Sequence, residues 1–448
     1  MGGDAVSRIF TYPDPETDVL GATQRPPPWH DVTDEQVREA IAGTALGPIV
    51  EALESVAVPP LPLPATLPRA IVLAGCALSE PVKDYNPEKE NDKRRGVELC
   101  RLQIGTAFGQ ALNAWHLLVA PSGSGKDIGG VPDLLASRME WSIGTAGSAE
   151  GLADAYSEIG NGFLNVAEFS PWLDFHHWQN KAASWMTSAW NRGWFKSNMS
   201  KRTNSTRQSR YCFPNICANI QPEVLAQVAT TRSMADGFLP RFLVTHMPRL
   251  KWRPAADPEY GLLTRAQDAL ERYRTRHGVV SVPDAYLQDL HDMFHELDAP
   301  FPAHWGRLVN EYGPRLAVML AVPYEADMLG RTVENENPGT VTLTDTQWQG
   351  AEVILQWFFA HAEIALASIA EDESEAKYER MLARLYRHIH RHAPVTLTEI
   401  SRNCGRGTKS YERLKIIEEL VSRGLVKKGE DDNTFSTSKM PPPTDWMA

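Results

Sequence analysis

A run of small residues around one lysine is the part of this sequence whose residue types and spacing most clearly suggest chemistry. Residues 119–130 read VAPSGSGKDIGG. From Ala120 to Lys126 they follow the phosphate-binding pattern G-x-x-x-x-G-K-[ST], with alanine in place of the first glycine. In such a loop the glycines let backbone N–H groups turn inward around a phosphate, and the lysine neutralises the terminal phosphates. We therefore predict a site for ATP and Mg²⁺ whose nucleotide-binding residues are Ser122, Gly123, Ser124, Gly125, Lys126 and Asp127.

Two positions of the predicted site differ from the usual pattern of nucleotide-hydrolysing enzymes. Asp127 stands where a Ser or Thr hydroxyl would bind Mg²⁺. In FLNVAE, residues 163–168, Glu168 keeps the position that orients the attacking water, whereas Ala167 replaces the aspartate that supports the metal. One hypothesis is that Asp127 is itself the metal ligand, because carboxylate oxygens suit Mg²⁺. The alternative is a decayed site in which Asp127 repels the phosphates.

Polar residues in later segments extend the predicted site. Asn219 in ICANIQP, with Gln221 as the second choice, can contact the γ-phosphate or the attacking water. Arg241 in DGFLPRF can stabilise transition-state charge at the γ-phosphate of a neighbouring subunit, and the alternative is a structural ion pair. Arg315 in YGPRLAVML is a candidate for contacting the phosphates from a helical lid. The predicted catalytic residues are Lys126, Glu168, Asn219 and Arg241.

The elements that must position these residues follow from the apolar pattern. Apolar segments that begin at Trp115, Gly162 and Tyr211 are typical of buried strands, and a helical segment at 147–160 lies between the first two. Strands that alternate with helices predict a parallel α/β sheet, here the core of a P-loop ATPase. Two apolar helices are also predicted before the glycine loop, in RAIVLAGCALSE and GVELCRLQIGTAFGQALNAW.

The expected organisation has four parts. They are a proline-rich and helical N-terminal region over 1–95, the ATPase core over 96–250, a helical lid over 251–370 and a C-terminal domain over 371–448. The acidic run EDESE at the start of the last part predicts a hinge between the lid and the C-terminal domain.

The order of these motifs resembles a large family of P-loop proteins of unknown function from prophages, plasmids and genomic islands. The resemblance covers roughly residues 60–370 and rests on the glycine loop, SAEGL, LNVAEFS, ANIQPEVL, DGFLPRFLV and the helical lid, in this order. Members are often described as replicative helicases and are similar to hexameric AAA+ ATPases, so the resemblance implies a ring. It implies catalytic roles at the matching positions Lys126, Glu168, Asn219 and Arg241, whereas Asp127 and Ala167 depart from the family pattern.

A basic segment precedes the third predicted strand. No acidic residue occurs between Asp174 and Glu223, and the polar centre KSNMSKRTNSTRQSR predicts an exposed loop or hairpin. In ring helicases a hairpin at this position projects into the central pore and grips single-stranded nucleic acid, and the alternative is a solvated charged insertion. The spacing of Trp185, Trp190 and Trp194 favours a core role for these rings. The predicted DNA contacts are Lys196, Lys201, Arg202, Arg207 and Arg210.

The C-terminal segment has the pattern of a winged-helix domain. Its first helix has the apolar stripe Tyr378, Leu382, Leu385 and Ile389. Thr396 and Glu399 form a capping box for a short second helix. SYERLKIIEELVSR is a third helix with Leu414, Ile417 and Val421 inward, and LVKKGEDDNTFSTS supplies a β wing. The predicted contacts to duplex DNA are Arg402, Arg406, Lys409 and Arg413, and docking of another protein is the alternative.

Composition and net charge restrict where DNA can bind on the protein and in which compartment the protein is expected. The net charge of −11 argues against nucleic acid over the whole surface, so DNA should meet the two basic stretches. The sequence has no apolar run of about 18 residues and no secretory pattern, and its five cysteines are scattered. These features favour a cytoplasmic protein without a membrane segment.

The function predicted from the sequence is that of a DNA-dependent ATPase. It would be a ring-forming replicative helicase, or a helicase-like motor, of a mobile genetic element. The second hypothesis is a DNA-binding scaffold, loader or regulator that binds nucleotide at a degenerate site without hydrolysing it. A third class, a protein-remodelling or defence ATPase, needs no contact with DNA.

Overall fold

The computed structural model gives the fold of most of the chain. It describes residues 31–55, 60–80, 102–105, 110–124, 130–144, 146–174, 177–190, 194–200, 205–210, 212–229, 237–249, 259–283, 285–286, 288, 292, 302–324, 341, 343–404, 410–429 and 434–438. The backbone alone is described at 194–200, 205–210, 302–303, 368–381, 384, 401–404 and 410–415.

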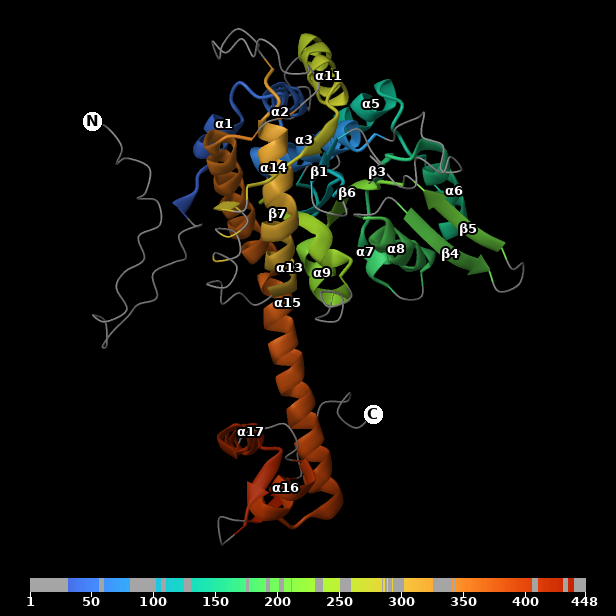
Figure 1. The fold of residues 1–448 in the computed structure, drawn as a ribbon. Coiled ribbons are helices and arrows are strands. Elements are labelled where there is room, and N and C mark those ends of the chain that lie inside the picture. Colours follow the sequence, from blue (N-terminus) through green and yellow to red (C-terminus); the bar gives the residue numbers. More distant parts are fainter. Residues whose placement is uncertain are drawn as a thin grey trace, which may run out of the picture.

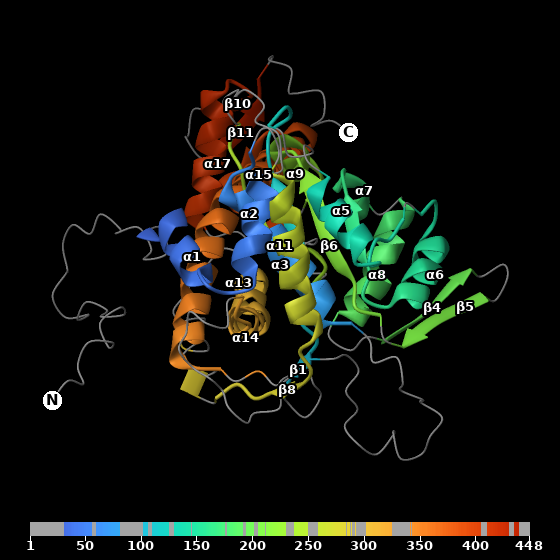
Figure 2. The same ribbon diagram turned by 90° about the horizontal axis from the view of Figure 1, so that it is seen from above.

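A four-stranded parallel sheet lies at the centre of the body (Figures 1 and 2). Its strands are β2 (Trp115–Val119), β3 (Phe163–Val166), β6 (Asn215–Ile220) and β7 (Phe242–His246). Their order is β3-β6-β2-β7. Every residue of β2 and β6 is buried, as expected when helices cover both faces of a parallel sheet. The predicted class, a mixed α/β fold with a parallel sheet, is confirmed.

Helices from several parts of the chain cover this sheet. They are α3 (Leu63–Leu78), α5 (Val131–Arg138), α6 (Ala149–Ile159), α7 (Ser170–Leu173), α8 (Trp178–Ala189) and α9 (Pro222–Val228). All sixteen residues of α3 are buried, and this helix contacts all four strands. The helices predicted over 69–80 and 147–160 are therefore present as α3 and α6. Trp185 and Trp190 are buried, as their spacing predicts.

The remaining helices of the body precede or follow the strands of the central sheet in the sequence. They are α1 (Asp34–Ile41), α2 (Leu46–Ser55), α11 (Tyr260–Arg274), α13 (Pro302–Arg307), the π-helical turn η3 (Leu308–Tyr312) and α14 (Gly313–Leu320). Helix α2 packs on α11, and α1 packs on the long helix α15 (Asp345–His392). A single hydrophobic core joins these helices to the sheet, so the predicted N-terminal, core and lid regions share one interior.

Two short elements differ from the sequence-based expectation. The helix predicted over residues 96–115 is wrong in the described part, because Leu102–Ile104 forms strand β1. This strand pairs in parallel with β8 (Gly278–Val280), and Gly105 donates its N–H to the Val280 carbonyl at 2.6 Å. The partner strand, distant in the sequence, overrides the helical spacing of the apolar residues.

The predicted hinge at residues 371–375 is also absent. Helix α15 runs without interruption for 48 residues, a length of about 70 Å, and leads from the body to a separate C-terminal unit (Figure 1). No helix in the described part of the chain is long and apolar enough to cross a membrane.

The C-terminal unit has its own small hydrophobic core. It consists of the end of α15, α16 (Leu397–Cys404), α17 (Ser410–Ser422) and the antiparallel sheet β10 (Val426–Lys428), β11 (Thr434–Thr437), β9 (Val395–Thr396). The predicted elements are present in the predicted order. Leu382, Leu385, Ile389 and Ile417 are buried in this core, and Val421 is partly buried at its margin. The capping box is formed, since Glu399 N–H donates to Thr396 Oγ1 and Thr396 N–H to Glu399 Oε2.

Candidate functional site

The connections of the parallel sheet define one edge as the candidate site. After β2 the chain continues to β3, which lies on one side of β2 in the sheet. After β6 it continues to β7, which lies on the other side of β2. In open α/β sheets, ligands bind outside the carboxyl ends of the strands at such a switch point. The loop that follows β2 leaves the sheet at this switch point between β2 and β6.

The described half of the glycine loop has the local geometry of a tight turn. Ala120 N–H donates to the Ile220 carbonyl at 3.0 Å, and Ser124 N–H donates to the Pro121 carbonyl at 3.3 Å. Gly123 has φ +69°, a left-handed conformation that favours glycine. Ser124 is only 2% exposed, and its buried hydroxyl has no hydrogen-bond partner among the described residues. A phosphate oxygen would supply the acceptor that this hydroxyl lacks. Gly125, Lys126 and Asp127 lie outside the described residues.

The segment after β3 reaches the same edge of the sheet. Phe169 N–H donates to the Asn219 carbonyl at 3.1 Å, which holds this segment against the end of β6. Glu168 is exposed, and its Oε1 accepts a hydrogen bond from Ser170 Oγ at 2.8 Å. Ala167 is exposed beside it. The structure therefore brings Glu168 and Asn219 together, with the glycine loop on the far side of β6.

Asn219 is in contact with an arginine that the sequence pattern did not single out. Its Oδ1 accepts a hydrogen bond from Nη2 of Arg69 on α3 at 3.2 Å, and both side chains are buried. The only signal in the sequence was an isolated charge inside an apolar helix. Gln221, the second choice, is the N-cap residue of α9 at the same edge.

A buried histidine lies below Asn219 on the same side of the sheet. Thr245 Oγ1 donates to the Pro64 carbonyl at 2.7 Å, so this hydroxyl can only accept from His116 Nε2, 2.8 Å away. Nε2 of His116 therefore carries a proton. Burial, and then the charge of Arg69, keep the pKa of His116 well below its usual value. A neutral His116 adds no positive charge beside Arg69.

A second arginine lies beside the glycine loop. An ideal Cβ on Gly123 would lie 3.8 Å from Nη2 of Arg249, a residue that follows β7 and is exposed. The chain after β7 runs alongside the loop because Met247 N–H donates to the Val119 carbonyl at 3.0 Å. Adjacent strands lie about 4.8 Å apart, so Arg249 approaches the loop from the side opposite to Glu168 and Asn219. No motif in the sequence marks this residue.

Arg241 lies at the other edge of the sheet. It ends the 3-10 turn η2 (Leu239–Arg241) directly before β7, and a five-residue strand is about 16 Å long. The structure therefore does not bring Arg241 to the glycine loop of its own chain. Its Nη1 donates to the Gly237 carbonyl, and burial, followed by the charge of Arg307, lowers its pKa to about 10.

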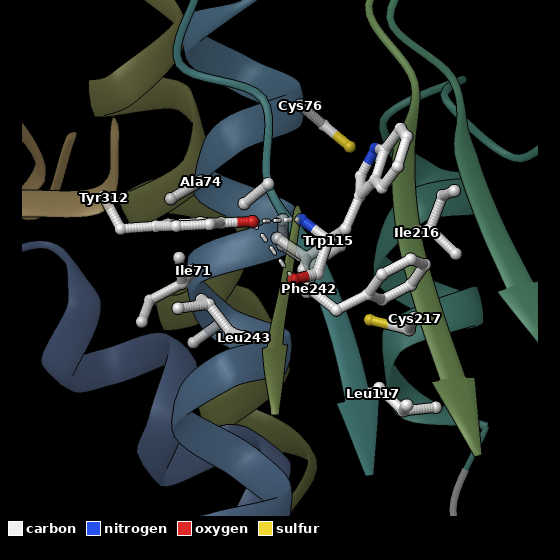
Figure 3. Packing of buried hydrophobic residues seen from close by; sticks show 14 of the residues in the cluster. Ile71, Ala74, Cys76, Trp115, Leu117, Ile216, Cys217, Phe242, Leu243 and Tyr312 are labelled. Carbon is white, nitrogen blue, oxygen red and sulfur yellow. Dashed lines mark hydrogen bonds between the residues drawn. The ribbon is translucent and has the colours of Figure 1, made fainter. Parts of the chain in front are cut away.

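The proposed phosphate contact of Arg315 is corrected by the structure. Arg315 is 0% exposed, its Nε donates to the Ala111 carbonyl at 3.0 Å, and its guanidinium lies 4.3 Å from the Trp190 ring centroid. Ala111 precedes β2, so this position is at the amino edge of the sheet. The same aromatic cluster contains Tyr312, whose hydroxyl is hydrogen-bonded to the backbone of Trp115 (Figure 3). Arg315 therefore stabilises the packing of α14 and does not face the loop.

The basic segment, predicted as an exposed loop or hairpin, forms a hairpin. Strands β4 (Trp194–Ser200) and β5 (Ser205–Arg210) pair antiparallel at the periphery of the body, next to α8 and α6 (Figures 1 and 2). Lys196 lies opposite Gln208, and Arg207 lies opposite Ser197 in the register. Arg210 ends β5, whereas Lys201 and Arg202 fall outside the described residues.

The predicted duplex contacts are distributed over the C-terminal unit. Arg402 lies on α16 and Arg413 on α17. Arg406 and Lys409 belong to the segment between these helices, outside the described residues. All four positions are thus at or between the second and third helices of the unit.

No protein-family model and no curated protein matches this sequence.

Proposed function

We propose that this chain is a P-loop nucleotide-binding protein, similar to AAA+ ATPases, that binds ATP and Mg²⁺ at the carboxyl edge of its parallel sheet. One observation carries the proposal. The loop after β2, Asn219 of β6 and Glu168 after β3 meet at the switch point of the sheet. The left-handed Gly123 and the buried Ser124 hydroxyl add to this support, because both suit a loop that encloses a phosphate.

Each residue of the site has a role in this proposal. Lys126 would neutralise the β- and γ-phosphates, and Asp127 would be the protein ligand of Mg²⁺. Glu168, whose carboxylate is oriented by the Ser170 hydroxyl, would accept a hydrogen bond from the attacking water. Mg²⁺ bound with ATP would supply charge neutralisation on the transferred phosphoryl group.

Nucleotide binding is tested first, by titration calorimetry with ATP and with ADP in the presence of Mg²⁺. Lys126→Ala should weaken binding of both nucleotides at least tenfold, an effect on the order of 1.4 kcal/mol. Lys427→Ala is the matched control, because it removes an exposed lysine from the C-terminal unit and should change nothing. Equal affinities for the wild type and Lys126→Ala would refute a site at the glycine loop.

The role of Asp127 is tested by exchanging the two unusual residues. If Asp127 holds the metal, Asp127→Ser should weaken Mg²⁺-dependent ATP binding, and adding Ala167→Asp should restore it. If the site has decayed, Asp127→Ser alone should tighten ATP binding, because a carboxylate that repels the phosphates is removed.

We further propose that the ATPase acts on DNA as a helicase or helicase-like motor. The β4–β5 hairpin carries the basic segment at the periphery of the body, where a strand of DNA has access to it. The C-terminal unit, with three helices and a β hairpin, is proposed as a winged helix that binds duplex DNA through α17 and the preceding segment.

Hydrolysis and DNA binding decide between the alternatives. An ATPase rate that rises when single-stranded DNA is added supports the motor. DNA binding with ATP binding but no hydrolysis supports the scaffold, loader or regulator, and hydrolysis without DNA binding supports a protein-remodelling or defence ATPase. Since Arg241 cannot reach its own loop, the proposal also requires a ring, which mass photometry with ATP and DNA would detect.

A further inference from the structure

Arg69 is the only charged residue of α3, a helix whose other residues are apolar except for Thr66. All sixteen residues of the helix are buried, and Arg69 is 6% exposed. Burial of a guanidinium is unfavourable by several kcal/mol unless hydrogen bonds offset it. An apolar side chain would satisfy the packing of α3 at lower cost. The presence of arginine therefore points to a task at the groups that it contacts.

The contact with Asn219 determines how the amide of that residue is oriented. Arginine carries five N–H donors and no acceptor, so the atom that faces its Nη2 at 3.2 Å must be the amide oxygen. The NH₂ group of Asn219 is then on the other branch of the amide.

The oriented side-chain amide of Asn219 lies on the side of the loop where the γ-phosphate of the proposed nucleotide would be. Asn219 is the second-last residue of β6, opposite Leu118 of the strand that leads into the glycine loop. Its carbonyl is also bonded to the segment that carries Glu168. Glu168 and Asn219 thus flank the same side of the loop, which is the side of the γ-phosphate if Glu168 orients the attacking water.

We infer that Arg69 is a positioning residue for the γ-phosphate contact of Asn219, and that this pair lets the chain distinguish ATP from ADP. Arg69 holds Oδ1, and Nδ2 donates to the γ-phosphate. ADP has no γ-phosphate and therefore gains nothing from the pair. The inference rests on the proposed nucleotide site and adds to it a residue from a helix far outside the phosphate-binding motif.

The test compares a non-hydrolysable ATP analogue with ADP, both with Mg²⁺, by titration calorimetry. Arg69→Met should weaken binding of the analogue about tenfold and binding of ADP less than twofold. Asn219→Ala should have the same effect. The double variant should be no weaker than Asn219→Ala alone, because residues that act through each other are not additive.

A matched control replaces another arginine that holds α3 in place. Arg274 on α11 is paired at 3.0 Å with Glu80, just beyond the end of α3. Arg274→Met should lower the melting temperature and leave the ratio of the two affinities unchanged. A change in that ratio would mean that any displacement of α3 alters selectivity, which would overturn a specific role for Arg69.

Other outcomes separate this inference from the proposed function. Failure of the wild type to bind either nucleotide would refute the nucleotide site itself. Equal weakening of analogue and ADP by Arg69→Met, or additive effects of the two substitutions, would overturn the inference and leave the nucleotide site standing. If Arg69→Met does not fold, Asn219→Ala still decides, because it must selectively weaken binding of the analogue.

Discussion

The guanidinium of Arg241 lies in surroundings that disfavour its charge, so methionine at this position should stabilise the folded chain. Burial is the main cause of its lowered pKa, followed by the charge of Arg307, and Arg315 adds a smaller repulsion. Glu311 attracts the guanidinium, but this carboxylate is already bonded to Arg307 and to the Trp190 indole, each at 2.5 Å. Nε of Arg241 is buried without a hydrogen-bond partner among the described residues.

The size of the effect follows from the pKa. The pKa of Arg241 falls from 12.5 to about 10, and each unit of pKa corresponds to about 1.4 kcal/mol, so the charged form is disfavoured by at most about 3 kcal/mol. Solvent still reaches part of the guanidinium, and methionine gives up the hydrogen bond to the Gly237 carbonyl. We therefore expect Arg241→Met to raise the free energy of unfolding by about 1 kcal/mol.

Urea unfolding followed by tryptophan fluorescence measures this difference. The folded pKa of Arg241 is lowered, so the folded state binds this proton less well than the unfolded state does. The loss of folding stability that the charged Arg241 causes is complete below about pH 10. It disappears only as the pH rises from about 10 towards 12.5. The gain in stability from Arg241→Met should therefore be constant between pH 6 and pH 9.

Arg307, the neighbour of Arg241 that is paired with Glu311, provides the control. Arg307→Met removes the ion pair with Glu311 and should lower the free energy of unfolding by about 1–3 kcal/mol. A similar loss for Arg241→Met would show that Arg241 is a structural ion pair. If Arg241→Met is more stable than the wild type but hydrolyses ATP more slowly, the arginine is retained for function at a cost in stability. Mixing it with Lys126→Ala protein should then restore some activity, because mixed rings contain intact interfaces.

Three further variants test other parts of the structure. Tyr312→Phe removes the hydroxyl that accepts the Trp115 N–H at 3.0 Å, and it should lower the free energy of unfolding by about 1–3 kcal/mol in the same urea assay. Replacing Lys201, Arg202 and Arg207 together by alanine should weaken binding of single-stranded DNA. The slope of log K against log salt should become smaller by about 2, as measured by fluorescence anisotropy. Arg249→Met should weaken ATP and ADP binding by the same factor, about threefold, in calorimetry, because Arg249 lies on the side of the loop away from Glu168.

For each of these variants, a different result would contradict the prediction. An unchanged midpoint for Tyr312→Phe would mean that water replaces the hydroxyl. An unchanged salt slope would leave the β4–β5 hairpin as a charged insertion that does not bind DNA. A selective effect of Arg249→Met on ATP would place this arginine at the γ-phosphate and reverse the orientation of the nucleotide proposed above.

The sequence by itself determined the elements whose signals are local. Mostly apolar segments predicted β2, β3 and β6, because strands in a parallel sheet that is covered on both faces are rich in apolar residues. The capping box at Thr396 predicted the start of α16, and the polar basic segment predicted a loop or hairpin, of which the structure has the hairpin. These signals work because a cap, a turn or a buried strand depends on residues only a few positions apart.

Only the tertiary structure decided which residues meet. Arg69 and Asn219 are 150 positions apart in the sequence, and their contact depends on how α3 crosses the sheet. The guanidinium of Arg315 is a group that can bind phosphate. However, Trp190, Tyr312 and the Ala111 carbonyl surround it at the amino edge of the sheet, opposite to the glycine loop. A guanidinium takes its role from the groups around it. Those groups are assembled by the crossover connections of the sheet, which no local pattern in the sequence encodes.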